Sequence, residues 1–426
     1  MSVVIIVTGA LVFFALIMAS IALHEIGHLL PAKLFDVKVT QYFVGFGRTL
    51  KSWRRGETEY GFKAIPLGGY VRLIGMYPPA RQGAKASRLQ RLADGARSYE
   101  YEEITPADDG RLFYQKPTWQ KLIIMFGGPL MNIVLAFVIF LGVNAAWGQY
   151  RPQLDLVAVS ECVVPQSRAE KVCQPGDPQS PAKRAGLEVG DRVVSFNGTT
   201  VSTWDEFSEL IRDNLDHEAN IVVDRGGRRV TTTTQTIITG MPDRLDPAKT
   251  VEVGFLGVTP AYERVRSGPV QTVQDMWRMT QQSAVALASF PVKVWNVGAD
   301  LVTGKPRDIN GPLSIVGASR VAGELAVQTD MKLGDKVSSW FMLLGSVNLF
   351  VALLNLVPLL PLDGGHMLGA IYEWFKRMGA RLFRRPDPGH VDTAKMLPVA
   401  YVVGGFLLLA GVVLILADII SPLKIF

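Results

Sequence analysis

The chain has 426 residues, of which 48% are hydrophobic and 19% are charged, and its formal net charge is +6. This composition is too apolar for an ordinary soluble enzyme and is typical of a membrane protein that carries a soluble insertion. The positive charge could suggest nucleic-acid binding, but the basic residues gather in two loops beside apolar segments. They therefore indicate orientation in a membrane, and no nucleic-acid partner is expected.

The first predicted element, residues 1–31, is a transmembrane helix that ends in an H-E-x-x-H motif. Residues 3–23 carry no charge, and His24, Glu25 and His28 follow them. On a helix the two histidines lie one turn apart on one face, where they can bind one zinc ion, and Glu25 can handle a proton of a zinc-bound water. The alternative is a helix turn whose polar groups are satisfied in a core. Ionisable groups in apolar helices are costly and usually functional, which favours the metal site.

We interpret this helix as a retained span and not as a signal peptide. It has no basic segment at its start, and cleavage near Ala19 or Ala22 would leave the motif at a new N-terminus. Basic residues follow the helix, namely Lys33, Lys38, Arg48, Lys51, Arg54 and Arg55. The positive-inside tendency then predicts an N-terminus outside and a metal site near the cytoplasm, roughly 7 to 13 Å inside the membrane boundary.

Residues 32–118 are predicted to form a cytoplasmic loop that includes a β-hairpin at 58–76. The hairpin sequence alternates apolar and polar residues around Pro66-Leu67-Gly68-Gly69-Tyr70, where the glycine pair predicts a turn. An ordinary cytoplasmic hairpin is the alternative to a role at the membrane. No role is predicted for residues 78–117, which are polar and show no clear periodicity.

The second predicted span covers residues 119–148. Gly127 and Gly128 lie near its start, and small residues in a membrane helix permit close packing of another helix. Asn132 is a polar group in this apolar helix. It either hydrogen-bonds a neighbouring helix or belongs to a substrate cleft.

Residues 150–262 have the character of a soluble domain outside the cytoplasm. Helix is predicted for 204–215, and strands for 219–223, 229–236 and 253–259, the last closing a sheet. The S-P-A-x-x-A-G-L-x-x-G-D pattern at 180–191 resembles bacterial PDZ domains, which bind extended chains or C-termini by strand addition. A plain structural insertion is the alternative.

The chain has two cysteines, Cys162 and Cys173, and both lie in this domain. They flank a loop with proline and charged residues, in a domain that the predicted topology places outside the cytoplasm, where disulfides persist. We therefore predict a disulfide, with free thiols as the alternative.

Residues 263–335 are predicted to be amphipathic connector helices at the outer membrane interface. The stretch 276–302 has helical, amphipathic character, but Pro291 and Lys293 argue against a span. These helices either gate access to the metal site or act as a brace on the surface.

The third predicted span, residues 336–366, ends in Leu362-Asp363-Gly364-Gly365-His366. A zinc hydrolase normally has three protein ligands, and a carboxylate on a turn at the end of a helix can reach the site of a neighbouring helix. Asp363 is therefore the best candidate for the third ligand, and a solvated aspartate is the alternative. Asn348 and Asn355 lie seven residues apart on one face of this span, where helix–helix hydrogen bonding is the simplest role.

The rest of the chain is predicted to be a cytoplasmic loop, residues 367–396, and a fourth span, residues 397–426. The loop carries six basic residues, which agrees with the orientation of the first loop, and the last span returns the C-terminus outside. His366 and His390 show no clear ligand geometry and are interpreted as interfacial and solvated.

The two motifs, His24-Glu25-Ile26-Gly27-His28 and Leu362-Asp363-Gly364-Gly365-His366, together resemble the site-2 protease family of intramembrane zinc metalloproteases, in particular its bacterial regulator-of-sigma-E type. The resemblance covers nearly the whole chain. It implies Zn²⁺ as the cofactor, His24, His28 and Asp363 as its ligands, and Glu25 as the catalytic base. It also implies the inner membrane of a bacterium as the location. One PDZ domain is found, where this type has two in tandem.

The same resemblance assigns substrate-binding residues. In the family the hairpin re-enters the membrane beside the active site, which implies that Gly68, Gly69 and Tyr70 lie near a substrate strand. Asparagines of the third span contact the substrate backbone in the family, which implies such a role for Asn355 and Asn348.

The expected fold is thus an α-helical polytopic membrane protein with four transmembrane helices, a membrane-associated β-hairpin and an inserted α+β PDZ domain. The expected function is hydrolysis of peptide bonds within transmembrane segments of single-span proteins. By resemblance, such a substrate is a trimmed anti-sigma factor or a remnant signal peptide, and the PDZ domain filters or docks it. Two alternatives are a non-catalytic membrane PDZ receptor, which would not need Glu25, and a zinc transporter. A transporter would need a path through the bilayer, whereas the sequence has one cluster of potential ligands near one face.

Overall fold

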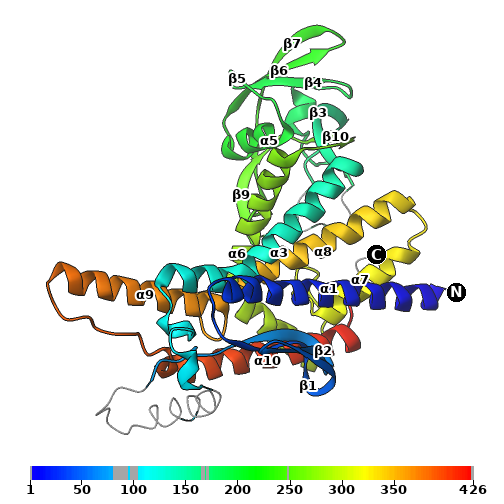
Figure 1. Cartoon of the computed structure of the whole chain (residues 1–426). Coiled ribbons are helices and arrows are strands. Elements are labelled where there is room, and N and C mark those ends of the chain that lie inside the picture. The colour runs from blue at the N-terminus through cyan, green and yellow to red at the C-terminus, as the bar shows by residue number, and fades with distance from the viewer. Residues whose placement is uncertain are drawn as a thin grey trace. The chain divides into compact units, whose positions relative to one another are not determined.

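In the computed structural model shown in Figure 1, the described residues are 2–79, 95, 104–164, 168, 172–246 and 249–423. The chain divides into two compact units, one made of Met1–Gly142 with Thr272–Phe426 and one made of Val143–Gln271. Residues 80–94 and 96–103, which belong to the segment without a predicted role, lie outside the described residues.

The first unit is built from long apolar helices. Among the described residues, five helices are long and apolar enough to cross a membrane. They are α1 (Ser2–Leu34), α3 (Thr118–Ala146), α6 (Pro269–Thr303), α8 (Leu333–Asn355) and α10 (Leu397–Ile420). Two further helices are α7 (Ile315–Val327) and α9 (Asp363–Leu382). The predicted class, a membrane protein with several long apolar helices, is confirmed at this level.

Helix α6 differs from the prediction that residues 263–335 form amphipathic connector helices at the membrane interface. It is one continuous helix that passes through Pro291, and its length and hydropathy are those of a possible span. A proline removes one backbone hydrogen bond, and packing of neighbouring helices makes this loss tolerable in membrane helices. Here Val294 and Val297 of α6 pack against Leu414 of α10, so this helix has a partner along its second half.

Helices α1 and α8 lie side by side and run in the same direction. The ring of Phe13 packs edge-on against Trp340, with centroids 5.6 Å apart. Further along both helices, the side-chain amide of Asn348 donates a hydrogen bond to Oγ of Ser20 over 3.1 Å. Residue numbers therefore rise together along the two helices, which brings the end of α8 to the level of the H-E-x-x-H motif.

Two long strands follow α1 and form an antiparallel pair, β1 (Val39–Arg55) and β2 (Thr58–Leu73). The chain reverses between the two strands at Gly56-Glu57. The predicted turn at Gly68-Gly69 is therefore wrong, because both glycines lie inside β2. The predicted hairpin range, 58–76, covers only the second of the two strands.

Glycines bend these strands instead of ending them. Gly45 and Gly47 in β1 have φ values of 95° and 81°, a region that other residues rarely adopt. The bend lets residues 41–44 pair with 69–72 along one edge and with 59–62 along the other. The glycine pair in β2 marks a second bend, with φ of 141° at Gly68.

The second unit contains a six-stranded sheet of order β10-β3-β4-β6-β7 with β5 paired to β4, and a separate pair, β8 and β9. The strands are β3 (Gln149–Val159), β4 (Arg192–Phe196), β5 (Thr199–Thr200), β6 (Glu218–Arg225), β7 (Arg228–Gln235), β8 (Ile237–Pro242), β9 (Thr250–Phe255) and β10 (Val258–Val265). The helices are α4 (Pro181–Arg184) and α5 (Trp204–Asp213). Leu156, Phe196, Phe207 and Ile221 lie in its buried core.

The predicted helix at 204–215 and the strands at 219–223 and 229–236 correspond to α5, β6 and β7. The single strand predicted at 253–259 is wrong, because Gly257, with φ of 92°, separates β9 from β10 and each joins a different sheet. The predicted disulfide between Cys162 and Cys173 is present.

Candidate metal centre

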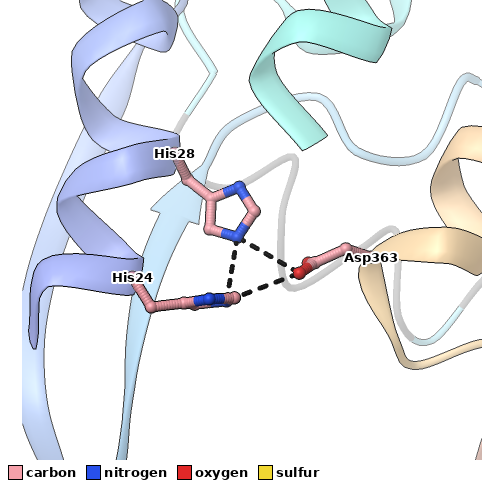
Figure 2. Close-up of side chains that lie close together, drawn as sticks. All are labelled: His24, His28 and Asp363. Atoms are coloured by element: carbon pink, nitrogen blue, oxygen red, sulfur yellow. Dashed lines mark hydrogen bonds and ion pairs between the residues drawn. The ribbon is translucent and has the colours of Figure 1, made fainter. Parts of the chain in front are cut away.

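Three side chains from two distant segments meet at one point, as Figure 2 shows: His24 and His28 from α1 and Asp363 from the first turn of α9. The two Nε2 atoms are 3.3 Å apart, and they lie 3.4 Å (His24) and 3.3 Å (His28) from Oδ2 of Asp363. Ligands held at 2.0–2.1 Å by a tetrahedral zinc ion would be about 3.3 Å from one another. The three atoms therefore have the mutual spacing of three tetrahedral ligands.

The burial of these atoms also fits a metal ion. Both imidazoles are buried, and Oδ2 of Asp363 and Nδ1 of His24 are buried without a hydrogen-bond partner among the described residues. Buried polar atoms normally have such a partner, so the Asp363 oxygen is placed to bind a group that is not part of the chain, such as a metal ion. Two imidazoles and one carboxylate, with a fourth position open, form a donor set typical of catalytic zinc.

The orientation of His28 is fixed by a neighbouring helix. Its Nδ1 lies 2.8 Å from the backbone carbonyl of Ile124 in α3. A carbonyl can only accept a hydrogen bond, so Nδ1 carries the proton and Nε2 presents its lone pair toward Asp363. Metal-binding histidines are commonly held in this way, with the nitrogen that does not bind the metal donating a hydrogen bond to a carbonyl or carboxylate.

Glycines allow α3 to come this close. A methyl group added to Gly27 would collide with the backbone of Gly127, and one added to Gly127 would collide with the backbone of Gly27. A methyl group on Gly128 would collide with Nε2 of His28 itself. The predicted close packing of a helix at these small residues is therefore confirmed, and it occurs directly beside the candidate metal ligands.

Glu25 lies beside the histidines and faces the bent strand β2. Val71 of that strand and Glu25 line the same cavity. A Cβ atom on Gly69 would be 3.0 Å from Cγ of Glu25, so the strand approaches this side chain as closely as a residue without a side chain permits. The strand and Glu25 therefore form adjacent walls of one site.

His24, Glu25, His28 and Asp363 all line one cavity, which has a volume of about 950 Å³. Of the residues predicted to bind substrate, Asn355 and the stretch Gly68-Gly69-Tyr70 line it. Asn348 does not, because its amide donates to Ser20 and to the Leu344 carbonyl in the interface between α8 and α1. The other lining residues come from α1, β2, α3, α8, α9 and α10, and from the segments between them.

His366 lines the same cavity, whereas the sequence interpretation placed it at a solvated interface. It follows Asp363 by three residues on α9, and residues at that spacing share a helix face. The signal was present in the D-G-G-H spacing, but it is usable only once a helix is known to begin at Asp363. Tyr401, Gly404 and Gly405 of α10 also line the cavity, and nothing in that apolar helix distinguishes them in the sequence.

The chain is similar to known metalloproteases over most of its length. The profile of peptidase family M50 matches residues 12–384. The chain is 34% identical to zinc metalloprotease Rip1 of Mycobacterium tuberculosis (strain H37Rv), over 99% of both chains. It is 33% identical to zinc metalloprotease Rip1 of Mycolicibacterium smegmatis, over 98% of both chains.

Proposed function

Because this chain belongs to peptidase family M50, the site-2 protease family, we propose that it is an intramembrane zinc metalloprotease that cleaves transmembrane segments of single-span proteins. One observation carries the proposal. A donor set with zinc spacing lies near the end of an apolar, span-length helix, beside Glu25 and a strand that line the same cavity.

The roles of the residues follow from their chemistry. His24, His28 and Asp363 would hold the zinc ion, which when bound polarises a carbonyl group and lowers the pKa of a water molecule. Glu25 accepts the proton of the attacking water and delivers it to the leaving amine. The Ile124 carbonyl keeps Nε2 of His28 unprotonated. These roles supply general acid–base and electrostatic catalysis from groups that are already in place.

The substrate is proposed to bind as an extended strand. Residues 69–73 pair with β1 along one edge, and the stretch from Gly68 to Leu73 lines the cavity. A strand edge offers backbone hydrogen bonds to an extended peptide, whereas a helical peptide bond is shielded from attack. The side-chain amide of Asn355, in the same cavity, can hydrogen-bond the substrate backbone. The substrate helix therefore has to unwind before cleavage.

Four spans, α1, α3, α8 and α10, are proposed, with α6 not crossing the membrane. The parallel course of α1 and α8 supports this. Between α1 and α8 the chain crosses the membrane once, as α3. If α6 crossed as well, α8 would run antiparallel to α1. With the positive-inside tendency, both termini lie outside and the metal centre lies near the cytoplasm of a bacterial cell.

The second unit is proposed to be a PDZ domain outside the cytoplasm that docks or filters substrates. The S-P-A-x-x-A-G-L-x-x-G-D pattern supports this, as does a sheet with helices and a disulfide in the same unit. Trimmed anti-sigma factors and remnant signal peptides are the proposed substrates, because both present a single span with little mass outside.

A reconstitution experiment tests the function. The full-length protein in liposomes is incubated with a tagged single-span protein that lacks its outer domain, and the products are mapped by mass spectrometry. We expect cleavage within the span, loss of cleavage with a zinc chelator, and recovery on adding zinc. Products cut only in loops outside the membrane, or cleavage that resists the chelator, would overturn the proposal.

A further inference from the structure

A second cavity lies between the start of α3 and helix α9, and it shares no lining residue with the metal centre. It has a volume of about 760 Å³. Its walls are mostly apolar and aromatic, with two guanidinium groups among them. The lining residues are Pro117, Thr118, Trp119, Leu122, Ile371, Trp374, Phe375, Arg377, Met378 and Arg381.

The cavity lies at the level where the first span ends. The ring of Trp119 packs edge-on against Phe35, with centroids 5.2 Å apart, and Phe35 directly follows α1. Trp119 and Trp374 are 55% and 46% exposed. Half-exposed tryptophans beside the end of a span are typical of the interface between acyl chains and headgroups.

The helix segment beside the cavity carries charge of one sign. Residues 376–385 contain five basic residues, Lys376, Arg377, Arg381, Arg384 and Arg385, and no acidic residue. Among the described residues, the exposed side chain of Arg381 has no ion pair or hydrogen bond. A guanidinium group at the mouth of an apolar cavity is thus available to an anion.

The nearest acidic groups do not cancel this charge. The buried carboxylate of Glu373 lies 3.1 Å from Nζ of Lys121 and also contacts His390 and Arg377 at 3.2 Å each. Asp387 lies 3.8 Å from Nε of Arg377. Both acids are therefore engaged on the side of Arg377, and Arg381 is the unengaged cation of the cavity.

We propose that this cavity is a binding site for an anionic phospholipid of the inner leaflet. Arg381, with Arg377 beside it, binds the phosphate and the anionic headgroup. Leu122, Ile371 and Met378 contact the acyl chains. Basic pockets beside spans on the cytoplasmic side are suited to such headgroups, and charge complementarity selects an anionic lipid over a zwitterionic one. Binding of the lipid at this cavity does not depend on the proteolytic activity.

Tryptophan quenching by brominated lipids tests the site in the full-length protein. The protein is placed in phosphatidylcholine nanodiscs that contain a small fraction of either brominated phosphatidylglycerol or brominated phosphatidylcholine. We expect stronger quenching by the glycerol lipid. Because Trp119 lines the same cavity, we expect the excess to shrink in Trp374→Phe and to disappear when Trp119→Phe is combined with it. The matched control is Trp295→Phe, which removes an exposed tryptophan beside an apolar cavity without basic residues and should keep the excess.

The charge requirement is tested with two arginines. Arg381→Gln should reduce the preference for the anionic lipid about fivefold. Arg385→Gln removes the same charge from the same segment, but this side chain lies over the ring of Phe383 and does not line the cavity, so it should leave the preference largely unchanged.

Three results would overturn the assignment. Equal quenching by the two lipids would mean an apolar crevice without headgroup selection. Equal losses in the two arginine variants would mean general attraction to a charged surface. Loss of the quenching on addition of inorganic phosphate would mean a site for soluble anions.

Discussion

Nδ1 of His28 in α1 donates a hydrogen bond to the backbone carbonyl of Ile124 in α3, over 2.8 Å. The bond joins the candidate metal centre to a second helix and decides which nitrogen of His28 is free to bind a metal. It exists because the two helices touch at glycines, with Gly27 against Gly127 and Gly128 against His28. Packing of α1 on α3 therefore helps to build the candidate metal centre.

The contact between Gly128 and His28 predicts that a larger residue at position 128 weakens zinc binding. Gly128→Ala should lower zinc binding strongly, because the added methyl group would collide with Nε2 of His28. Gly142→Ala is the matched control on the same helix, since nothing lies within 4 Å of its Cβ position, and alanine there should stabilise the helix by about 1 kcal/mol. Zinc content per chain and thermal unfolding check both variants. Full zinc occupancy in Gly128→Ala would contradict the packing argument.

Removal of a ligand should remove the metal. His28→Ala should lower the zinc affinity by more than the roughly 10- to 100-fold that is lost when a group hydrogen-bonded to a metal ligand is removed. His217→Ala changes an exposed histidine of the other unit and should leave zinc binding unchanged. Competition with a fluorescent chelator measures both affinities. Equal affinities in the two variants would place the metal elsewhere.

An ion pair between a partly exposed arginine and a buried aspartate should stabilise the second unit. Arg225 contacts both carboxylate oxygens of Asp191, at 2.7 and 2.8 Å, and Asp191 is fully buried. Arg225→Ala leaves that buried carboxylate with the backbone N–H of Glu188 as its remaining hydrogen-bond partner, which should cost about 2 kcal/mol. Arg228→Ala removes an exposed arginine nearby and should cost less than about 0.5 kcal/mol. Hydrogen exchange of peptides from β4 and β6 measures the loss of stability in each variant. Similar protection in the two variants would contradict a stabilising role of the ion pair.

The loop before α3 should lose stability in acid. A hydrogen bond from Lys38 holds the pKa of Asp108 at about 2; burial raises it, and Thr105 lowers it further. Because the folded pKa lies below the ordinary value of 3.8, this stabilisation is present above about pH 4 and is lost as the pH falls toward 2.

Lys38→Met isolates that contribution. The variant should show a smaller drop in thermal midpoint between pH 5 and pH 3 than the wild type. Lys395→Met removes an exposed lysine in the other predicted cytoplasmic loop and should keep the full drop. An unchanged drop in Lys38→Met would show that other carboxyl groups govern the acid range.

The parts of the site that could be predicted from the sequence are those with local spacing. His24, Glu25 and His28 lie within two turns of one helix, so their relationship follows from helix geometry alone. Asp363 was the best candidate to complete a zinc site, and the resemblance to site-2 proteases supplied most of the support for it. His366 was missed because its place depends on a helix that begins at Asp363, and that start is set by the fold around the site.

The errors of prediction have long-range causes. The glycine pair Gly68-Gly69 has the composition of a turn, but β1 bends at its own glycines and pairs on both edges, which keeps both residues inside a strand. Asn348 and Asn355 share a helix face, yet only Asn355 lines the cavity. Asn348 lies two turns earlier in α8, where its amide donates a hydrogen bond to Ser20 of α1.

The central claim is that Glu25 performs the proton transfer at a zinc ion held by its neighbours. The most direct test compares the wild type with Glu25→Gln in liposomes, on a tagged single-span substrate without its outer domain, with zinc content measured in parallel. The account predicts that both proteins bind zinc and that the variant cleaves at least about 10²-fold more slowly. Cleavage by Glu25→Gln at the wild-type rate, or a wild type that binds no metal, would contradict it.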